Sequence, residues 1–153
     1  MSEVRIPDNL PKWIADHMQR YIETDGADGH MWDSAPVGGP GPIPTLLLTT
    51  TGRRSGKSLV MPLIYGEANG AYVVIASKGG APKHPAWYLN LAANTEVEVQ
   101  VIADRFRAKA RTATGDERTN MWKIMREIYP PYDEYQGKTD REIPVIVLER
   151  ING

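Results

Sequence analysis

Hydrophobic residues near the start of the chain recur at the spacing of an amphipathic helix. Residues 9–23 (NLPKWIADHMQRYIE) carry an apolar side chain every three or four positions, which predicts one helix. Asp8 or Asn9 is expected to cap its beginning, and residues 24–26 (TDG) to end it. The next stretch, 27–44, is rich in Gly and Pro and predicts an irregular crossing.

Short apolar runs and strict alternation predict six strands in the rest of the chain. Residues 68–70 (ANG) are a hairpin signal, and Ala103-Asp104 joins the two strands that alternate most regularly. Pro62 lies inside a predicted strand and marks a bulge or a sheet edge. The predicted strands are 45–51, 58–67, 71–78, 96–102, 105–113 and 143–151.

Two further helices are predicted between these strands. Residues 86–94 follow Pro85, which suits the start of a helix. Thr114 and Glu117 have the spacing of a capping box, so a helix is expected to begin there and to stop before Pro130. The residues of this helix that are expected to be buried are Met121, Trp122, Met125 and Ile128.

The element pattern indicates an α+β fold. Six mostly antiparallel strands with helices between them predict a small barrel with flanking helices. A doubly wound sheet is disfavoured, because short hairpins rather than helical crossovers join neighbouring strands. We expect a single domain, in which the helix and crossing of residues 1–44 precede a barrel formed by residues 45–153.

Composition narrows the function classes. The 153 residues carry a net charge of −1, which gives no general reason to expect binding to nucleic acid. The absence of cysteine excludes disulfides, and His17, His30 and His84 lack metal-ligand spacing. No apolar run approaches the roughly 18 residues of a membrane span, and no signal-peptide core is present. These features predict a cytoplasmic protein without a metal.

Positive charge is nevertheless concentrated around one turn, residues 49–58 (TTTGRRSGKS). The window 52–87 holds five basic residues and one acidic residue, whereas the rest of the chain holds 13 and 18. The turn is not a nucleotide-binding P-loop, because Gly52 and Gly56 enclose three residues instead of four and Pro62 opposes a following helix. A local basic region in an acidic chain favours a small anionic ligand, although an exposed basic hairpin turn would have the same sequence.

Three blocks resemble the deazaflavin-dependent nitroreductase family of actinobacteria, the A-type branch of the flavin/deazaflavin oxidoreductases. They are LLLTTTGRRSGKSLVMPLIY, VIASKGGAPKHPAWYLNLAANTEVEV and IYPPYDEYQGKTDREIPVIVLER, and they span about Thr45 to Arg150. The resemblance implies a split β-barrel that binds coenzyme F420, whose phosphate and oligoglutamate tail are anionic. The basic turn would then hold the phosphate and the tail.

The resemblance also implies which residues bind the cofactor. Arginine offers forked hydrogen bonds to phosphate or carboxylate, lysine a point charge, and a Gly-bounded turn a nest of N–H groups. The ring system would lie against two strand ends and a short helix, although some of these apolar residues would equally suit a barrel core. The implied cofactor-binding residues are Arg53, Arg54, Ser55, Lys57, Val60, Met61, Pro62, Leu63, Ile75, Ala76, Ser77, Lys78, Ala86, Trp87 and Asn90.

Three tyrosines follow the third helix, in a segment (131–142) expected to be a polar loop. Tyr129, Tyr132 and Tyr135 are spaced by three, which places them on one side of a helical or turn-like segment. In the family, tyrosines at these positions shape the substrate pocket and one phenol is proposed as a proton donor. Tyr132 is the first candidate for that role and Tyr135 the second. Core or interface packing is the alternative.

The implied activity is hydride transfer from reduced F420 to an activated alkene, a lactone or coumarin-type enone, or a quinone. Leu59 and Ile64 depart from the basic and aromatic residues common in the family, which argues against carrying over nitroimidazole reduction. The first helix has a mixed charged face, so it is expected to pack on the barrel rather than bind lipid. Alternatives are a related FMN-binding reductase, a non-catalytic carrier of the cofactor or a lipophilic ligand, and a nucleotide-binding module.

Overall fold

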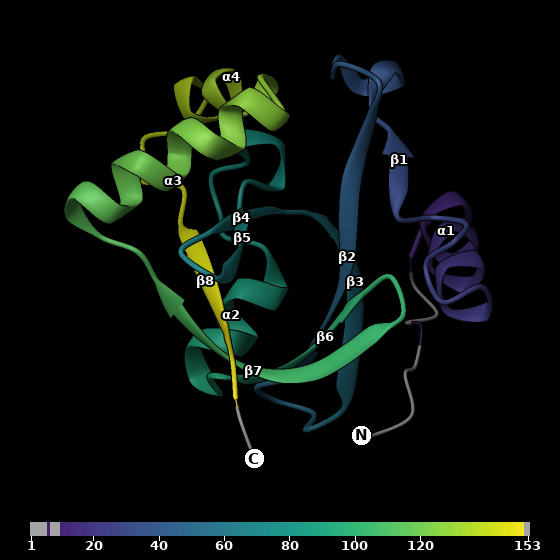
Figure 1. The fold of residues 1–153 in the computed structure, drawn as a ribbon. Helices are drawn as coiled ribbons and strands as arrows, with labels where there is room; N and C mark the ends of the chain where they lie inside the picture. Colours follow the sequence, from purple (N-terminus) through teal and green to yellow (C-terminus); the bar gives the residue numbers. More distant parts are fainter. Residues whose placement is uncertain (1–5, 7–9, 152–153) are drawn as a thin grey trace.

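The computed structural model describes residue 6 and residues 10–151. In this part of the chain, eight antiparallel strands curl into a half-barrel in the order β1-β2-β6-β7-β8-β5-β4, with β3 paired to β2 (Figure 1). The strands are β1 (Met31–Asp33), β2 (Pro42–Thr51), β3 (Ser58–Ile64), β4 (Gly66–Ala68), β5 (Ala71–Ile75), β6 (Glu96–Val101), β7 (Asp104–Thr112) and β8 (Val145–Arg150).

Helices cover both sides of this sheet. Figure 1 shows α3 and α4 together over one end of the half-barrel and α1 on the outer side of β2. The α-helices are α1 (Lys12–Glu23), α2 (Ala86–Ala93), α3 (Gly115–Ile128) and α4 (Pro131–Gly137), and two 3₁₀ turns are η1 (Ala35–Val37) and η2 (Lys78–Gly80). The predicted antiparallel barrel with flanking helices is confirmed.

The expected strand count of six was too low. The crossing 27–44 contains β1, η1 and the first three residues of β2, whose Pro42 and Pro44 pair with β1. The prolines concealed this strand extension, yet they lie before the β2–β3 ladder begins at Thr45. The predicted strand 58–67 is two strands, because the chain leaves the β2 ladder at Tyr65 and β4 pairs with β5 instead.

Two tight turns connect β4 to β5 and β6 to β7. Asn69 and Gly70 both have positive φ (54° and 78°), as the tight turn between β4 and β5 requires. The turn between β6 and β7 is Ile102-Ala103 rather than Ala103-Asp104, since Asp104 already pairs with Val101.

Two expectations about the helices after β7 were wrong. Thr114 lies at the N-cap of α3 but makes no side-chain capping bond, and Glu117 accepts two hydrogen bonds from Arg111 (2.6 and 2.9 Å) instead. A bidentate charged pair is stronger than the capping bond that Glu117 would have made. Residues 131–137 form the helix α4 and not a loop, because Pro131 suits its first turn and Asp133 complements the helix dipole there.

The predicted first helix packs on the barrel as expected. Met18 and Tyr21 are fully buried against Leu47 and Val60. The structure begins this helix at Lys12, and the proposed caps Asp8 and Asn9 lie outside the described residues.

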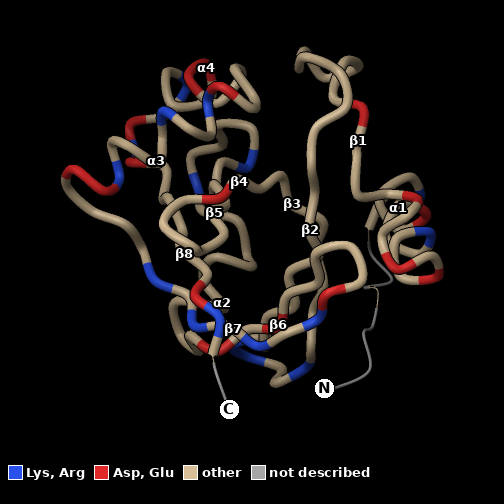
Figure 2. Tube along the Cα trace, viewed as in Figure 1, with Lys and Arg blue, Asp and Glu red and all other residues tan. Residues whose placement is uncertain are grey.

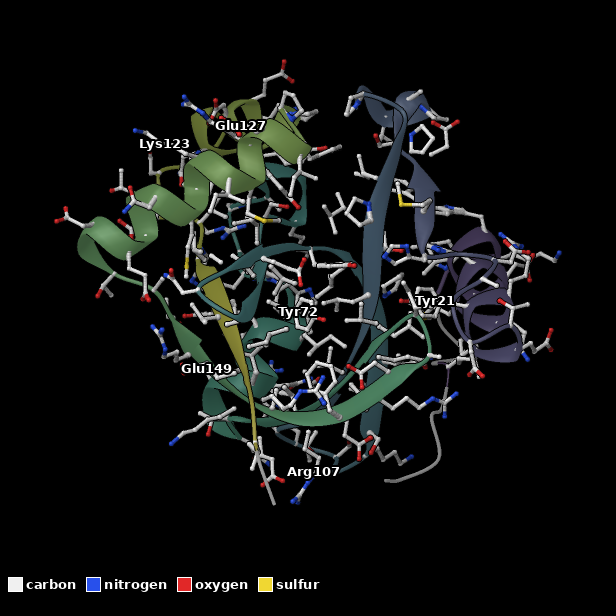
Figure 3. The ribbon with its side chains drawn as sticks, in the orientation of Figure 1. Tyr21, Tyr72, Arg107, Lys123, Glu127 and Glu149 are labelled. Carbon is white, nitrogen blue, oxygen red and sulfur yellow. The ribbon has the colours of Figure 1, made fainter. Side chains whose placement is uncertain are left out.

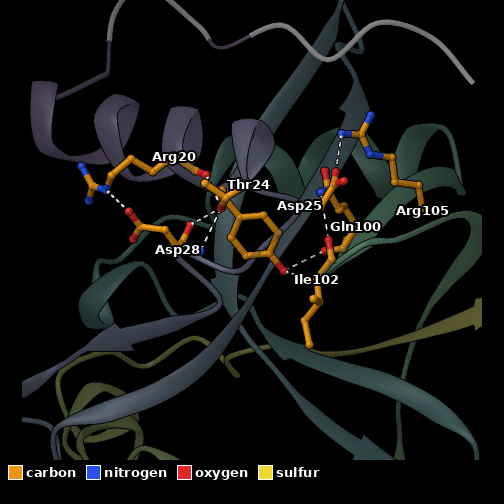
Figure 4. Close-up of polar contacts among 8 residues, drawn as sticks. Arg20, Thr24, Asp25, Asp28, Gln100, Ile102 and Arg105 are labelled. Carbon is orange, nitrogen blue, oxygen red and sulfur yellow. Dashed lines mark hydrogen bonds and ion pairs between the residues drawn. The ribbon is translucent and has the colours of Figure 1, made fainter.

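Tyr21 attaches the end of α1 to the sheet. Its hydroxyl donates to the carbonyl of Thr45 (3.0 Å) and accepts from the N–H of Ile102 (2.8 Å). Arg105 adds an ion pair to Asp25 (3.6 Å) just beyond the helix (Figure 4). The polar anchors and the apolar face together hold α1 against β2 and β6.

Hydrophobic cores lie on both faces of the sheet. Inside the half-barrel, Val74 and Leu148 pack with Leu91 of α2, and Tyr72 points toward this interior in Figure 3. Under α3 and α4, Val73 and Val147 pack with the buried Met121 and Met125, while Trp122 and Ile128 are only partly buried. Strand β8 is therefore apolar on both faces, as predicted for an interior strand.

Candidate active site

A cavity of about 680 Å³ runs along β3. That volume lies within the range of small-molecule and cofactor sites. Most of its lining is apolar or aromatic and comes from α1, β1 to β3, β5, α2 and the α4 region. The lining residues are Leu10, Trp13, Ile14, His17, Trp32, Val37, Thr45, Thr50, Leu59, Val60, Met61, Pro62, Leu63, Ile64, Ile75, Ser77, Lys78, Gly79, Pro85, Ala86, Trp87, Asn90, Tyr129, Tyr132 and Tyr135.

The free edge of β3 borders this cavity. Two hydrogen bonds flank the β2–β3 ladder, from Gly52 N–H to Lys57 O (2.8 Å) and from Tyr65 N–H to Pro44 O (3.3 Å). Hydrogen-bonded and non-hydrogen-bonded pairs alternate along an antiparallel ladder. Pro62 is therefore in a non-hydrogen-bonded pair, where its missing N–H costs nothing, and the continuous register supports the edge assignment over a bulge.

The same alternation decides which backbone groups of β3 face away from β2. Leu59, Met61 and Leu63 exchange hydrogen bonds with β2, so the N–H and C=O groups of Val60 and Ile64 and the C=O of Pro62 point toward the free edge. Val60, Pro62 and Ile64 thus offer backbone donors and acceptors along the free edge, beside an apolar wall. A flat heterocycle with a polar edge fits such a surface.

The expected ring-binding residues are brought together here with one exception. Val60 to Leu63, Ile75, Ser77, Lys78, Ala86, Trp87 and Asn90 all line the cavity. Ala76 does not, because its side chain is fully buried in the barrel core. Alternation along the chain explains this, since Ala76 and its neighbours point to opposite sides.

The basic turn lies beside the cavity and is tied to it through one residue. Asn90, which lines the cavity, accepts hydrogen bonds at Oδ1 from the backbone N–H (3.2 Å) and from Nη1 (2.9 Å) of Arg53. Its Nδ2 donates to Oγ1 of Thr50 (3.4 Å). The side chain of Asn90 therefore positions Arg53, and its own polar groups already have protein partners.

Most of the N–H groups expected to form a nest in this turn already have partners. Four of the six N–H groups of residues 52–57 are bonded elsewhere: Gly52 to Lys57, Arg53 to Asn90, Gly56 to Gly52, and Lys57 to Oγ of Ser55. The consecutive N–H groups of Arg54 and Ser55 are the two that remain for an anion, so side chains must supply most of its contacts.

Side-chain charge is available for that purpose. In the described part of the chain, no carboxylate lies within ion-pair distance of Arg54, Lys57 or Lys78. Figure 2 shows basic segments along the end of the molecule where the β2–β3 turn lies. Unpaired cations next to a cavity attract an anionic group.

The three tyrosines meet at the other part of the cavity. The hydroxyls of Tyr129 and Tyr135 are 2.7 Å apart, and the Tyr132 ring meets Tyr129 edge-on with centroids 4.9 Å apart. Burial raises the pKa of Tyr132, and the neighbouring tyrosines add to this effect. Burial, followed by the bond to Tyr135, also raises the pKa of Tyr129. Both phenols therefore remain protonated at neutral pH.

The side of the cavity formed by α1 and β1 was not predicted. Trp13 stacks on Trp32 with centroids 6.2 Å apart, and the buried His17 places Nε2 2.7 Å from the carbonyl of Gly29. The apolar stripe of residues 9–23 was the available signal, but it was assigned wholly to packing. The two positions noted as departures, Leu59 and Ile64, also line the cavity.

The described residues contain neither a metal site nor a membrane-spanning helix. Among residues 6 and 10–151, no group of three or more His, Asp or Glu side chains could hold a metal ion. No helix in the same residues is long and apolar enough to cross a bilayer.

The half-barrel, the edge-strand cavity and the basic turn are the features of a split-barrel protein with room for a small-molecule ligand. The model of the F420H(2)-dependent quinone reductase family matches residues 13–150, so the chain belongs to this family. It is accordingly an F420-dependent oxidoreductase whose cofactor is coenzyme F420.

Individual proteins similar to this chain support the family assignment. The F420H(2)-dependent quinone reductase Rv1261c of Mycobacterium tuberculosis is 38% identical over 137 residues, which cover 88% of this chain and 87% of the relative. A solved F420-H2 dependent reductase (FDR-A) is 51% identical, with a TM-score of 0.64 over 69% of this chain and 93% of that chain. A solved domain-swapped dimer is 45% identical, with a TM-score of 0.68 over 90% and 97% of the two chains. The heme storage protein HutZ of Vibrio cholerae, at 19% identity and a TM-score of 0.54, shares the fold alone.

Proposed function

We propose that this protein transfers hydride from reduced F420 to a quinone or an activated alkene, with a tyrosine supplying the proton. The observation that carries the proposal is the continuity of one cavity. It extends from Asn90, which holds Arg53 of the basic turn, along the free edge of β3 to Tyr132. The residues proposed to bind the ring and to donate the proton therefore line a single space, and those proposed to hold the anion lie beside it.

The residues present fit the cofactor. Arg54, Lys57 and the remaining donors of Arg53 would hold the phosphate and the acidic tail, and Lys78 would add charge from η2. The free edge groups of Val60 and Ile64 would bond the polar rim of the ring. Trp87, 8% exposed, would pack near the ring and exclude water.

When bound and reduced, the deazaflavin supplies a hydride. Reduction of a quinone or an enone needs one proton for each hydride, and the chain must provide it. The Tyr132 hydroxyl is proposed to donate that proton from Oη and to take one back from solvent. The same hydroxyl would hydrogen-bond the acceptor oxygen as negative charge develops there.

The cavity also indicates the kind of acceptor. The walls next to the tyrosines are apolar, with Ile64 and Val37 beside aromatic rings. Lys78 is the one charged side chain in the described lining, so a flat, mostly apolar acceptor such as a quinone, coumarin or cyclic enone is favoured over a highly charged one. Ile64 leaves a wider and less polar wall than an aromatic residue would, which argues against nitroimidazole as the preferred substrate.

Fluorescence titration of the purified protein with F420 and, separately, FMN tests the cofactor site. Saturable binding of F420 alone, followed by oxidation of reduced F420 with menadione or 2-cyclohexenone, is the expected result. Binding of FMN alone would overturn the assignment of the basic turn. Binding of F420 without turnover of any quinone or enone would indicate a carrier instead of an enzyme.

A further inference from the structure

The guanidinium of Arg141 hydrogen-bonds to the loop that follows β5. Nε donates to the carbonyl of Ala81 (2.8 Å), Nη2 to that of Ser77 (2.7 Å), and Nη1 to that of Ala76 (3.2 Å). Nη1 also lies 3.1 Å from Nδ1 of His84, which accepts as a neutral ring. One side chain therefore holds residues 76–84 at four points and, among the described residues, makes no ion pair.

The backbone of Arg141 is held in turn by the tyrosine helix. Gln136 of α4 donates from Nε2 to the carbonyl of Arg141 (2.8 Å) and accepts at Oε1 from the N–H of Ile143 (2.9 Å). Gln136 follows Tyr135 directly. The segment that carries Arg141 thus cannot shift without disturbing the end of α4.

A second contact joins the same two parts. Gly80 has φ of 82°, and a Cβ on it would lie 2.6 Å from the carbonyl oxygen of Tyr135. The loop and α4 are therefore in direct backbone contact, which only glycine permits. Both sides of this contact line the cavity, through Ser77, Lys78 and Gly79 on one side and Tyr135 on the other.

We propose that Arg141 is a positioning residue that sets the separation between the cofactor wall, residues 77–79, and the tyrosines that face the acceptor. The proposal rests on the proposed function for what the two walls bind. Hydride transfer needs reacting atoms about 3–3.5 Å apart, and a misplacement of about 1 Å can cost about 100-fold in rate. A rigid bridge between donor wall and acceptor wall keeps that separation constant.

The sequence could not assign this role. Arg141 lies in GKTDREIP, a polar stretch that reads as a solvated loop, and its partners are 57 to 65 positions away. Its acceptors are mostly backbone carbonyls, which leave no signature in side-chain identity. Arginine suits the role because its planar fork reaches several carbonyls at fixed angles, whereas lysine is a point donor.

The test compares R141M and R141K with R111M. Arg111 is a matched control, because its guanidinium also makes three hydrogen bonds, to Glu117 and Glu149, but lies outside the cavity lining. For each protein we would measure the F420 dissociation constant, the single-turnover rate with reduced F420 and menadione, and amide hydrogen exchange of residues 76–84 and 131–137.

We expect R141M to lower the single-turnover rate about 10- to 100-fold, to weaken F420 binding less than it lowers the rate, and to speed exchange in both segments. R141K should recover part of the rate, and R111M should change none of these values. If R141M and R141K match R111M in rate and exchange, the proposal is wrong. If R141M does not fold, R141K alone decides by the same comparison.

A different result would contradict the proposed function. Wild-type protein that binds no F420 would reject the cofactor assignment. Exchange would still report whether losing Arg141 frees α4 together with the loop. Faster exchange confined to residues 76–84 would show that the bridge does not reach the tyrosines, and it would overturn the inference.

Discussion

The hydroxyls of Tyr129 and Tyr135 lie 2.7 Å apart and hydrogen-bond each other across the cavity wall. This pairing distinguishes three tyrosines that sequence spacing makes equivalent. Tyr132 packs against both rings, yet no described residue hydrogen-bonds its hydroxyl. Since that residue lines the cavity, its hydroxyl is the one that we propose as the proton donor.

Tyr132→Phe should therefore lower kcat at least about 100-fold with little change in F420 affinity, because general acid catalysis of this kind contributes about 10²–10⁴-fold. Steady-state kinetics with menadione and fluorescence titration with F420 measure the two effects. Tyr88→Phe is the control, as Tyr88 lies outside the cavity lining. Weaker F420 binding with unchanged kcat would remove Tyr132 from the proton-donor role.

Arg54→Ala should weaken F420 binding, by about 10-fold at low salt, because an exposed cation loses its contact with the anionic part of the cofactor. The difference from wild type should shrink as salt rises, since salt screens exposed charges. Titrations at low and high salt check this. Arg105→Ala makes the same charge change at the β6–β7 turn and should leave affinity unaltered; equal dissociation constants for Arg54→Ala and wild type would place Arg54 outside the clamp.

Asn90→Leu should weaken both the fold and cofactor binding. The substitution removes the acceptor of the Arg53 N–H and Nη1, and leaving such groups unpaired costs about 1–3 kcal/mol. Urea unfolding and F420 titration measure the two effects. Asn94→Leu, at the exposed end of α2, is the control. Unchanged affinity in a destabilised Asn90→Leu protein would show that Arg53 needs no positioning by Asn90.

Stability should fall as pH drops below about 6.5. Burial, and then the nearby Arg141, lowers the pKa of His84 from its ordinary 6.5, so the unfolded chain takes up the proton first. The contribution of neutral His84 is thus complete above pH 6.5 and is lost between 6.5 and the lower folded pKa. His30, whose pKa burial also lowers, acts in the same direction.

His84→Gln isolates this effect, because a glutamine oxygen can accept from Arg141 without titrating. Urea unfolding at pH 7.5 and 5.5 should show a smaller loss of stability in this variant than in wild type. Identical losses in the two proteins would show that His84 does not contribute to the acid sensitivity.

Patterns among neighbouring residues were enough to predict most of the strands. Alternation in 96–102 and 105–113 and the Asn69-Gly70 turn act over a few residues, so the hairpins follow from nearby chemistry alone. The helix α4 and the strand β1 were missed for the same reason, since three to seven residues rich in Pro, Gly or charge give no clear period. Glu117 shows the limit of local rules: a partner on β7 takes it from its expected capping bond.

By itself, the sequence determined the antiparallel α+β class, the basic turn, the tyrosine triplet and the family blocks, because each depends on residue types at short spacing. The tertiary structure alone decided that Asn90 holds Arg53, that Ala76 turns into the core, and that α1 completes the cavity. It also brought Arg141 to the carbonyls of Ala76, Ser77 and Ala81. These relationships join residues far apart in the chain, many of them through backbone groups that every residue possesses, and only the folded geometry selects which of them meet.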